Sequence, residues 1–336
     1  MAIIRTERAQ VLWAAEHTEN VTAPGPYARF GIHDTIEAPD PEFGWEPHFG
    51  VFSGRDRATI LRGQATLRGS LPDVRLQAGL TTFLQVHVLG PVQGYNELVR
   101  PFTLYIGLLD NTGSVVLGRY FTGGKVNRAT VSAAEGQELR MSIDEMLFRR
   151  LYTTRDGGND PYTASGPAAD PGYLPYGRFM FAHGTVTMAG VTFPTVRRFN
   201  LSVDNQIEPR YYIQRDGTTG LLYPNALIEG RRVWRVEVDV DITNPYGVGD
   251  LELWDFLVNQ GAAGSGAVNM TSGGQVTLTF APVGGMGGNL TITCGGSPSV
   301  TQPSGVLVSA PHSIPAPPAG VVTVTASFDI DRVTVA

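Results

Sequence analysis

The chain has 336 residues, of which 42% are hydrophobic and only 17% are charged, and its formal net charge is −6. A typical soluble domain carries about 25% charged residues, so less of this surface is suited to water and burial by partner molecules is expected. The acidic balance argues against tight binding of nucleic acid, which needs clustered Lys and Arg side chains. The length favours two domains of about 100 to 200 residues each.

The N-terminal segment lacks the features of a targeting sequence. Arg5, Glu7 and Arg8 interrupt any apolar core of a signal peptide. No stretch approaches the roughly 20 apolar residues of a transmembrane helix. The single cysteine, Cys294, has no partner for an intrachain disulfide. We therefore expect an intracellular chain that is soluble when made.

Short runs of alternating polar and apolar residues, separated by Gly, Pro, Asn and Asp, fill most of the chain. This pattern is typical of an all-β sandwich or barrel. The runs that show it best are 64–77, 102–110, 114–121, 185–193, 199–204, 233–242, 275–280, 289–294 and 321–335.

Residues 79–90 interrupt the strand pattern with apolar side chains at helical spacing. The spacing includes Leu80, Phe83, Leu84 and Val88, and Gly90 stands where helices commonly end. The last part, VHVL, is also compatible with a strand. Residues 250–261 show a similar spacing, with Asp250 at the N-cap position, and this match favours a short helix in both places.

Residues 153–178 have little periodicity and are rich in Gly, Pro, Ala and Asp. We interpret them as a connecting loop between a first domain, residues 1–178, and a second domain, residues 179–336. A second loose stretch, residues 295–320, lies within the second domain. Long loops in a compact β domain usually mediate function or contacts.

The two halves share an ordered series of features. In the first half, the pair Glu46-Pro47 is followed by Gly63, an alternating strand and the first helical segment. In the second half, Glu208-Pro209 is followed by Gly230, the strand 233–242 and the second helical segment. This order predicts an internal duplication.

The strand 233–242, VWRVEVDVDI, has one apolar face and one charged face. Arg235, Glu237, Asp239 and Asp241 alternate with buried-type residues. Three interpretations stay open for the charged face: a solvated surface, an interface or channel wall, and a calcium or acid-pair site.

The residue pattern offers little catalytic chemistry. The histidines are scattered, and neither a metal-binding spacing, a phosphate-binding loop nor a nucleophile motif is present. We therefore predict that the protein is not an enzyme and needs no metal or cofactor. A β-rich hydrolase, with carboxylates contributed by separate strands, is the weakest of the hypotheses.

Several segments in this order resemble a known family. They are LWAAEHT (12–18), IEAPDPEFGWEPHFGVFSGRD (36–56), GGKVNRATVSAAEGQELRMSIDE (123–145), GVTFPTVRRFNLSVDNQIEPRYYI (190–213) and PNALIEGRRVWRVEVDVDI (224–242). Together with the closing β region, they resemble the major tail tube proteins of long-tailed bacteriophages with non-contractile tails. The resemblance covers residues 9 to 335.

The resemblance implies an all-β fold of two tandem tail-tube-like β-sandwich or barrel domains, each with a short flanking helix. It implies a structural virion protein of the tail, assembled in the host cytoplasm into stacked rings, trimeric and pseudo-hexameric, that form the channel for DNA ejection. The implied partners are other copies of the chain, the tape measure protein, the tail terminator and tip proteins, and double-stranded DNA in transit, with no membrane.

In a tube of this kind, the charged strand face would line the channel. The expected channel-lining residues are Arg235, Glu237, Asp239 and Asp241, with Arg68 and Ser70 as their counterparts in the first half. Pro72 interrupts the first-half strand, which lacks the acidic row. The alternative hypothesis is a two-domain β-sandwich that binds a carbohydrate or receptor, as in a tail-tip or adhesin protein.

Overall fold

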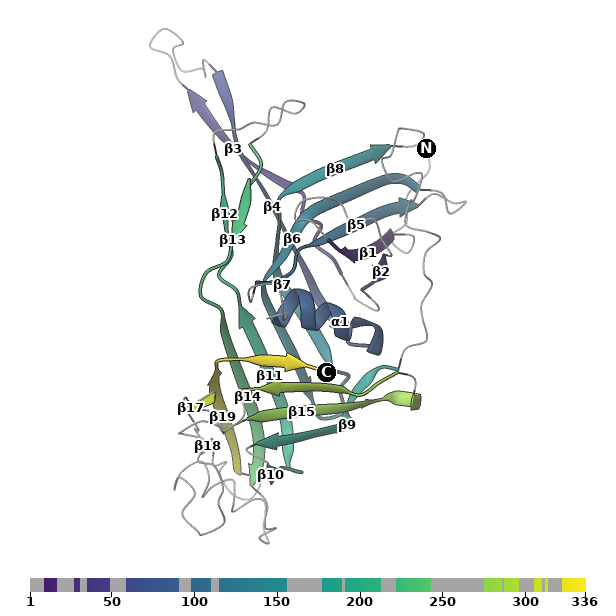
Figure 1. The fold of residues 1–336 in the computed structure, drawn as a ribbon, viewed down its shortest axis with the longest axis vertical. Helices are drawn as coiled ribbons and strands as arrows, with labels where there is room; N and C mark the ends of the chain where they lie inside the picture. The colour runs from purple at the N-terminus through teal and green to yellow at the C-terminus, as the bar shows by residue number, and fades with distance from the viewer. Residues whose placement is uncertain are drawn as a thin grey trace.

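A computed structural model describes the chain over residues 9–16, 27–30, 35–48, 59–90, 98–109, 115–155, 177–188, 191–212, 222–242, 275–285, 287–295, 305–309, 312–313 and 322–336. This part of the chain is mostly β-structure (Figure 1), which confirms the predicted all-β fold class. None of its helices is long and apolar enough to cross a bilayer.

The first half contributes one set of strands. They are β1 (Ala9–Ala15), β2 (Ala28–Arg29), β3 (Pro41–His48), β4 (Thr59–Arg75), β5 (Phe102–Leu109), β6 (Val115–Ala134), β7 (Arg140–Phe148) and β8 (Arg150–Arg155). β8 includes residues 153–155, so these residues belong to a strand and not to the loop predicted for residues 153–178.

The second half contributes the remaining strands. They are β9 (Phe179–Met188), β10 (Val191–Thr192), β11 (Val196–Asp204), β12 (Glu208–Arg210), β13 (Ala226–Ile228), β14 (Val233–Ile242), β15 (Val276–Pro282), β16 (Leu290–Cys294), β17 (Gly305–Ser309), β18 (His312–Ser313), β19 (Val322–Ile330) and β20 (Val333–Val335). A short 3₁₀ turn, Val283–Gly285, follows β15.

One antiparallel run of strands passes through both halves. Its order is β3-β4-β7-β6-β11-β14-β19-β17, and we refer to it as the long ladder. The two halves meet where β6 pairs with β11, for example Val131 opposite Leu201. We refer to this junction as the intrachain seam.

Each half also forms a side sheet. The first side sheet has the order β8-β6-β5-β1-β2, because the N-terminal part of β6 leaves the long ladder to pair with β5 and β8. The second side sheet has the order β10-β9-β15-β16-β20. Figure 1 shows the first side sheet in the upper part of the molecule and the second in the lower part.

The two halves repeat one strand order in both layers. In the long ladder, β3-β4-β7-β6 corresponds to β11-β14-β19-β17, and in the side sheets β2-β1-β5-β6-β8 corresponds to β10-β9-β15-β16-β20. The registers correspond as well. Glu46 lies opposite Leu61 and Glu208 opposite Ile228, so the Glu-Pro pairs seen in the sequence occupy equivalent positions in two hairpins.

Each side sheet carries a row of paired apolar residues on its core face. In the first, Trp13 pairs with Leu104 and Leu104 with Phe121. In the second, Met188 pairs with Val276 and Val276 with Cys294. All six side chains are buried in one continuous hydrophobic core.

The segment after β4 is helical, as predicted, and not a strand. It passes from a 3₁₀ turn (Ala78–Leu80) through α1 (Thr81–Phe83) to a π-helical turn (Leu84–Leu89), and ends at Gly90, whose φ of 33° favours glycine. The ring of Phe83 lies 4.8 Å from Trp13 and 4.8 Å from Phe30. The second predicted helix, residues 250–261, lies outside the described residues.

This helical segment lies between the two side sheets (Figure 1). It packs on β1 and on Phe30, just after β2, through Phe83, and its π-helical turn contacts β20 of the second half. Burial of these apolar faces ties the halves together behind the long ladder.

Two irregularities bend the long strands. At Gly123 the backbone has a φ of 63° and its N–H donates to the buried carboxylate of Glu16 at 2.7 Å, where β6 turns from the first side sheet into the long ladder. In β4 the pairing with β7 shifts around Pro72, and Asp73 has a φ of 55°. The predicted interruption at Pro72 is therefore present.

Candidate functional site

The long ladder has one buried face and one polar face. Along β11, β14 and β19, apolar residues such as Phe199, Val238 and Phe328 are fully buried, whereas the alternating residues between them are partly or fully exposed. The polar face consists of Arg68, Ser70, Arg128, Thr130, Ser132, Arg140, Ser142, Asp144, Arg198, Asn200, Ser202, Asp204, Arg235, Glu237, Asp239, Asp241, Thr323, Thr325, Ser327 and Asp329.

The acidic residues of β14 have cross-strand partners on both sides. Asp239 accepts a hydrogen bond from Arg198 Nε at 2.8 Å and another from the hydroxyl of Thr325 at 2.7 Å. Asp241 accepts from the hydroxyl of Thr323 at 2.8 Å and lies 3.4 Å from Arg197 Nε. Two of the three acids in the row are therefore neutralised by arginines of β11.

The remaining charged residues of β14 differ from one another. Arg235 pairs with Asp329 at 3.2 Å, and both side chains are 51% exposed, so the pair adds little stability. Glu237 lies opposite Asn200 and Ser327 and has no ion-pair partner within the described residues. It is the acid of the row that presents its charge to the open side.

In the first half, Arg68 and Ser70 lie on β4 and also face away from the core. Arg68 Nε lies 2.8 Å from the carboxylate of Glu145, which also binds Arg128 at 3.2 Å. Arg128 belongs to the polar face and lies opposite Asp204 in the intrachain seam. Because Arg68 and Arg128 bind the same carboxylate, Arg68 lies on the polar face as well. Ser70 donates to Glu37 at 2.9 Å.

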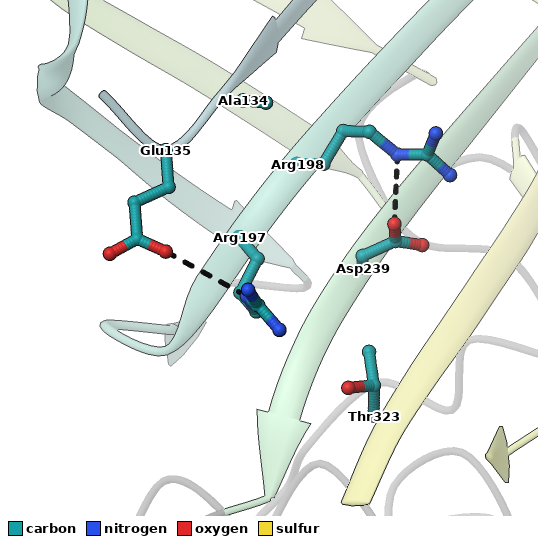
Figure 2. Close-up of a pocket in the computed structure, with 6 residues that line it drawn as sticks. All are labelled: Ala134, Glu135, Arg197, Arg198, Asp239 and Thr323. Atoms are coloured by element: carbon teal, nitrogen blue, oxygen red, sulfur yellow. Dashed lines mark hydrogen bonds and ion pairs between the residues drawn. The ribbon is translucent and has the colours of Figure 1, made fainter. Parts of the chain in front are cut away.

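A depression of about 550 Å³ lies at one end of the polar face, lined by Ala134, Glu135, Arg197, Arg198, Asp239 and Thr323 (Figure 2). Arg198 binds Asp239, and Arg197 lies 3.7 Å from Glu135. Both cations are therefore paired. Among the described residues of the lining, the carboxylates of Glu135 and Asp239 are bound by these arginines, and the hydroxyl of Thr323 donates to Asp241.

The polar face as a whole is a set of ion pairs and hydroxyl groups. The described residues contain no group of three His, Cys, Asp or Glu side chains able to hold a metal ion. Two groups with shifted pKa values lie in the core instead. Burial lowers the pKa of His87 to about 4 and raises the pKa of the Cys294 thiol to about 12.

The sequence pattern of β14 does not show which arginines neutralise its acids. Arg197 and Arg198 come from β11, far from β14 in sequence, and only strand pairing brings them together. A signal was available in RRFNLSVD, where Arg198, Asn200, Ser202 and Asp204 alternate with apolar residues as on β14.

A second polar cluster lies buried at the intrachain seam. Lys125 Nζ lies 2.9 Å from Glu229, and both side chains are about 5% exposed. Arg232 binds the same carboxylate at 3.3 Å, and its guanidinium also donates to the Asn205 amide oxygen. Asn205 in turn donates to the carbonyl of Val126 at 2.8 Å. The network connects β6 of the first half to the segment before β14.

The arrangement of two similar halves along one open ladder agrees with the match to a family model. The model described as phage tail tube protein matches residues 6–329. The chain belongs to the phage tail tube protein family. This tail tube protein has no match among curated proteins.

Family membership makes the tail tube protein a structural component of the virion tail and points to a non-enzymatic role. The polar face is then a candidate for contact with the contents of the tube, because no part of the chain that the structure describes covers it over β11, β14 and β19. The receptor-binding alternative is not favoured.

Proposed function

We propose that this tail tube protein forms closed rings of three copies that are pseudo-hexameric and stack into the tail tube of a non-contractile tail. The observation that carries the proposal is the repeated strand order of the two halves. One chain supplies two equivalent ladder segments, residues 1–178 and 179–336, so a ring of three chains contains six segments.

The polar face lines the channel through which double-stranded DNA leaves the capsid. The described arginines on this face and at its edge are all engaged with carboxylates: Arg68 and Arg128 with Glu145, Arg140 with Asp73, Arg197 with Asp241, Arg198 with Asp239, and Arg235 with Asp329. Phosphates passing this wall meet no free arginine cluster, so little counterion release holds the DNA in place. Among the described residues of this face, the carboxylates without an arginine partner are Asp144, Asp204 and Glu237, so the charge that remains is acidic.

We propose further that the tube assembles in the host cytoplasm around the tape measure protein, between the tip and the terminator proteins. The long ladder leaves room for such contacts, because neither its polar face nor its end strands are covered by other described parts of the chain.

Electron microscopy of concentrated purified protein tests the ring directly. We expect rings with a central channel and sixfold-like features in class averages, with threefold symmetry emerging at higher resolution. Isolated particles at all concentrations, combined with specific signal on a glycan array, would support the receptor-binding alternative instead.

A further inference from the structure

The two end strands of the long ladder, β17 and β3, correspond to the two strands of the intrachain seam, β6 and β11. We propose that β17 of one copy pairs with β3 of the next copy in the register of the β6–β11 seam, which places Ser309 opposite Glu42 of the neighbouring copy. The inference rests on the proposed ring and names the edges, the register and the chemistry that join its copies.

The edges follow from the strand order. In the described residues, β3 pairs only with β4, and β17 and β18 pair only with β19, so the ladder is open at both ends. Within the chain, β6 ends the first segment and β11 begins the second. The counterpart of β6 is β17, and the counterpart of β11 is β3. Because neighbouring strands of the ladder are antiparallel, β17 runs in the same direction as β6, and β3 runs in the same direction as β11. A second copy therefore continues the ladder without reversing a strand.

The register on the β17 side is set by a shared irregularity. The pairing of β6 with β7 shifts between Val126 and Arg128, and the pairing of β17 with β19 shifts between Leu307 and Ser309. Ser309 is therefore the counterpart of Arg128.

The register on the β3 side follows from the Glu-Pro hairpins. Asp204 precedes Glu208 by the same interval as Glu42 precedes Glu46, and the pairing partners Val233 and Thr66 correspond. Glu42 is therefore the counterpart of Asp204. Because Arg128 lies opposite Asp204 within the chain, Ser309 lies opposite Glu42 between copies.

The hairpin that crosses the intrachain seam gives a second, independent observation. The β12–β13 hairpin packs on the first half: Ile207 and Leu227 form a cluster with Leu147 of β7, and Tyr211 lies 3.1 Å from the hydroxyl of Thr66. The corresponding hairpin, β3 with the start of β4, projects from the end of the molecule in Figure 1. In the ring it crosses onto the neighbouring copy.

The two seams differ in chemistry. The buried cluster of the intrachain seam uses Lys125, Asn127, Asn205, Glu229 and Arg232. The counterparts at the seam between copies are Val306, Val308, Phe43, Arg62 and Ala65. By residue type, the seam between copies therefore has no equivalent of the Lys-Glu-Arg network, and four of these five counterparts are apolar.

The seam between copies also has fewer backbone donors. The N–H of Asn205 donates to the carbonyl of Asn127 at 2.8 Å, so by the two-residue alternation of a strand the N–H of Val203 also faces β6. The counterpart of Val203 is Pro41, which has no N–H. In this register, the joint between copies therefore has one backbone hydrogen bond fewer than the joint between halves at this position.

Disulfide trapping tests the register. Residues opposite each other in a non-hydrogen-bonded antiparallel pair have Cα atoms about 4.5 Å apart, within the range for a disulfide. We expect Glu42→Cys/Ser309→Cys to form covalent oligomers on mild oxidation, in a ladder that ends at three copies. Intramolecular linkage is excluded because six strands separate β3 from β17 in the ladder, roughly 30 Å at the usual strand spacing.

The matched control is Glu42→Cys/Ser313→Cys, which displaces one cysteine by roughly 13 Å along the edge. It should give at least tenfold less covalent product, and either single variant should give none. Cys294 does not interfere, because it is fully buried and its thiol pKa is raised to about 12.

The outcomes separate this inference from the proposed ring. Rings that form without the Glu42–Ser309 disulfide overturn the seam and leave the ring standing. Equal yields from the two cysteine pairs overturn the register. Absence of both rings and covalent trimers overturns the proposed function itself.

Discussion

Lys125 of β6 lies 2.9 Å from Glu229, and this buried ion pair joins the first half of the chain to the second. The pair is reinforced by Arg232 and by the backbone N–H of Val99, which donates to the Glu229 carboxylate at 3.0 Å. A buried charge that loses its partner is costly, so the network holds the relative position of the halves.

Replacing Lys125 with Met should lower the free energy of unfolding of the isolated subunit by about 3 kcal/mol, because Glu229 then keeps only Arg232 as a counter-charge in a buried site. Urea denaturation measures the effect. The double variant Lys125→Met/Glu229→Gln should recover part of the loss, and a double variant no better than the single one would contradict the pairing.

The stability of the subunit should fall on acidification through His87. The ring is buried, its Nδ1 donates to the carbonyl of Arg100 at 2.7 Å, and burial lowers its pKa from 6.5 to about 4. Between these values the unfolded chain binds the proton and the folded chain does not, so the free energy of unfolding decreases as the pH falls from 6.5 to 4, by at most about 3 kcal/mol.

Urea denaturation at pH 7 and pH 5 checks this dependence. The variant His87→Gln should be less stable at pH 7 but should lose less stability on acidification than the wild type. His183→Gln, at an exposed position of β9, serves as control and should keep the wild-type difference. An unchanged difference in His87→Gln would exclude His87 as the source.

Gly124→Ala should destabilise the bend of β6. An added Cβ would lie 2.8 Å from the carbonyl oxygen of Phe102 and would overlap the ring of Phe148, which is fully buried. We expect a loss of about 2 kcal/mol, in line with overpacking of a core. Gly288→Ala, where nothing lies within 4 Å of the added carbon, should be neutral, and thermal melts of the two variants distinguish the cases.

Reversing the acidic row, as Glu237→Lys/Asp239→Lys/Asp241→Lys, should leave rings and tubes intact but slow DNA release. The change removes the carboxylates that bind Arg197 and Arg198 and exposes a basic stripe to the phosphates. Ejection kinetics of virions built with the variant measure the effect, which should weaken as salt increases.

The uncharged variant Glu237→Gln/Asp239→Asn/Asp241→Asn is the matched control, and it should slow ejection less than the lysine variant. Ejection at the wild-type rate from the lysine variant would contradict the assignment of this face to the channel.

The sequence alone determined the local elements. Two-residue periodicity predicted the strands, because one face of each is buried, and the spacing of Leu80, Phe83 and Leu84 predicted a helix at α1. It also predicted the equivalence of the Glu46-Pro47 and Glu208-Pro209 segments, since tight turns and bulges need particular residues at fixed intervals.

The tertiary structure decided which charges meet. Asp239 and Asp241 are neutralised by arginines that lie far from them in the sequence, and Lys125 also lies far from its partner Glu229. No local periodicity connects the members of these pairs. Their contacts arise from strand order and register, which are set by packing of the two halves around one core. The strand VWRVEVDVDI shows its charged face in the sequence, but only the pairing of β14 with β11 and β19 shows that most of this charge is already balanced.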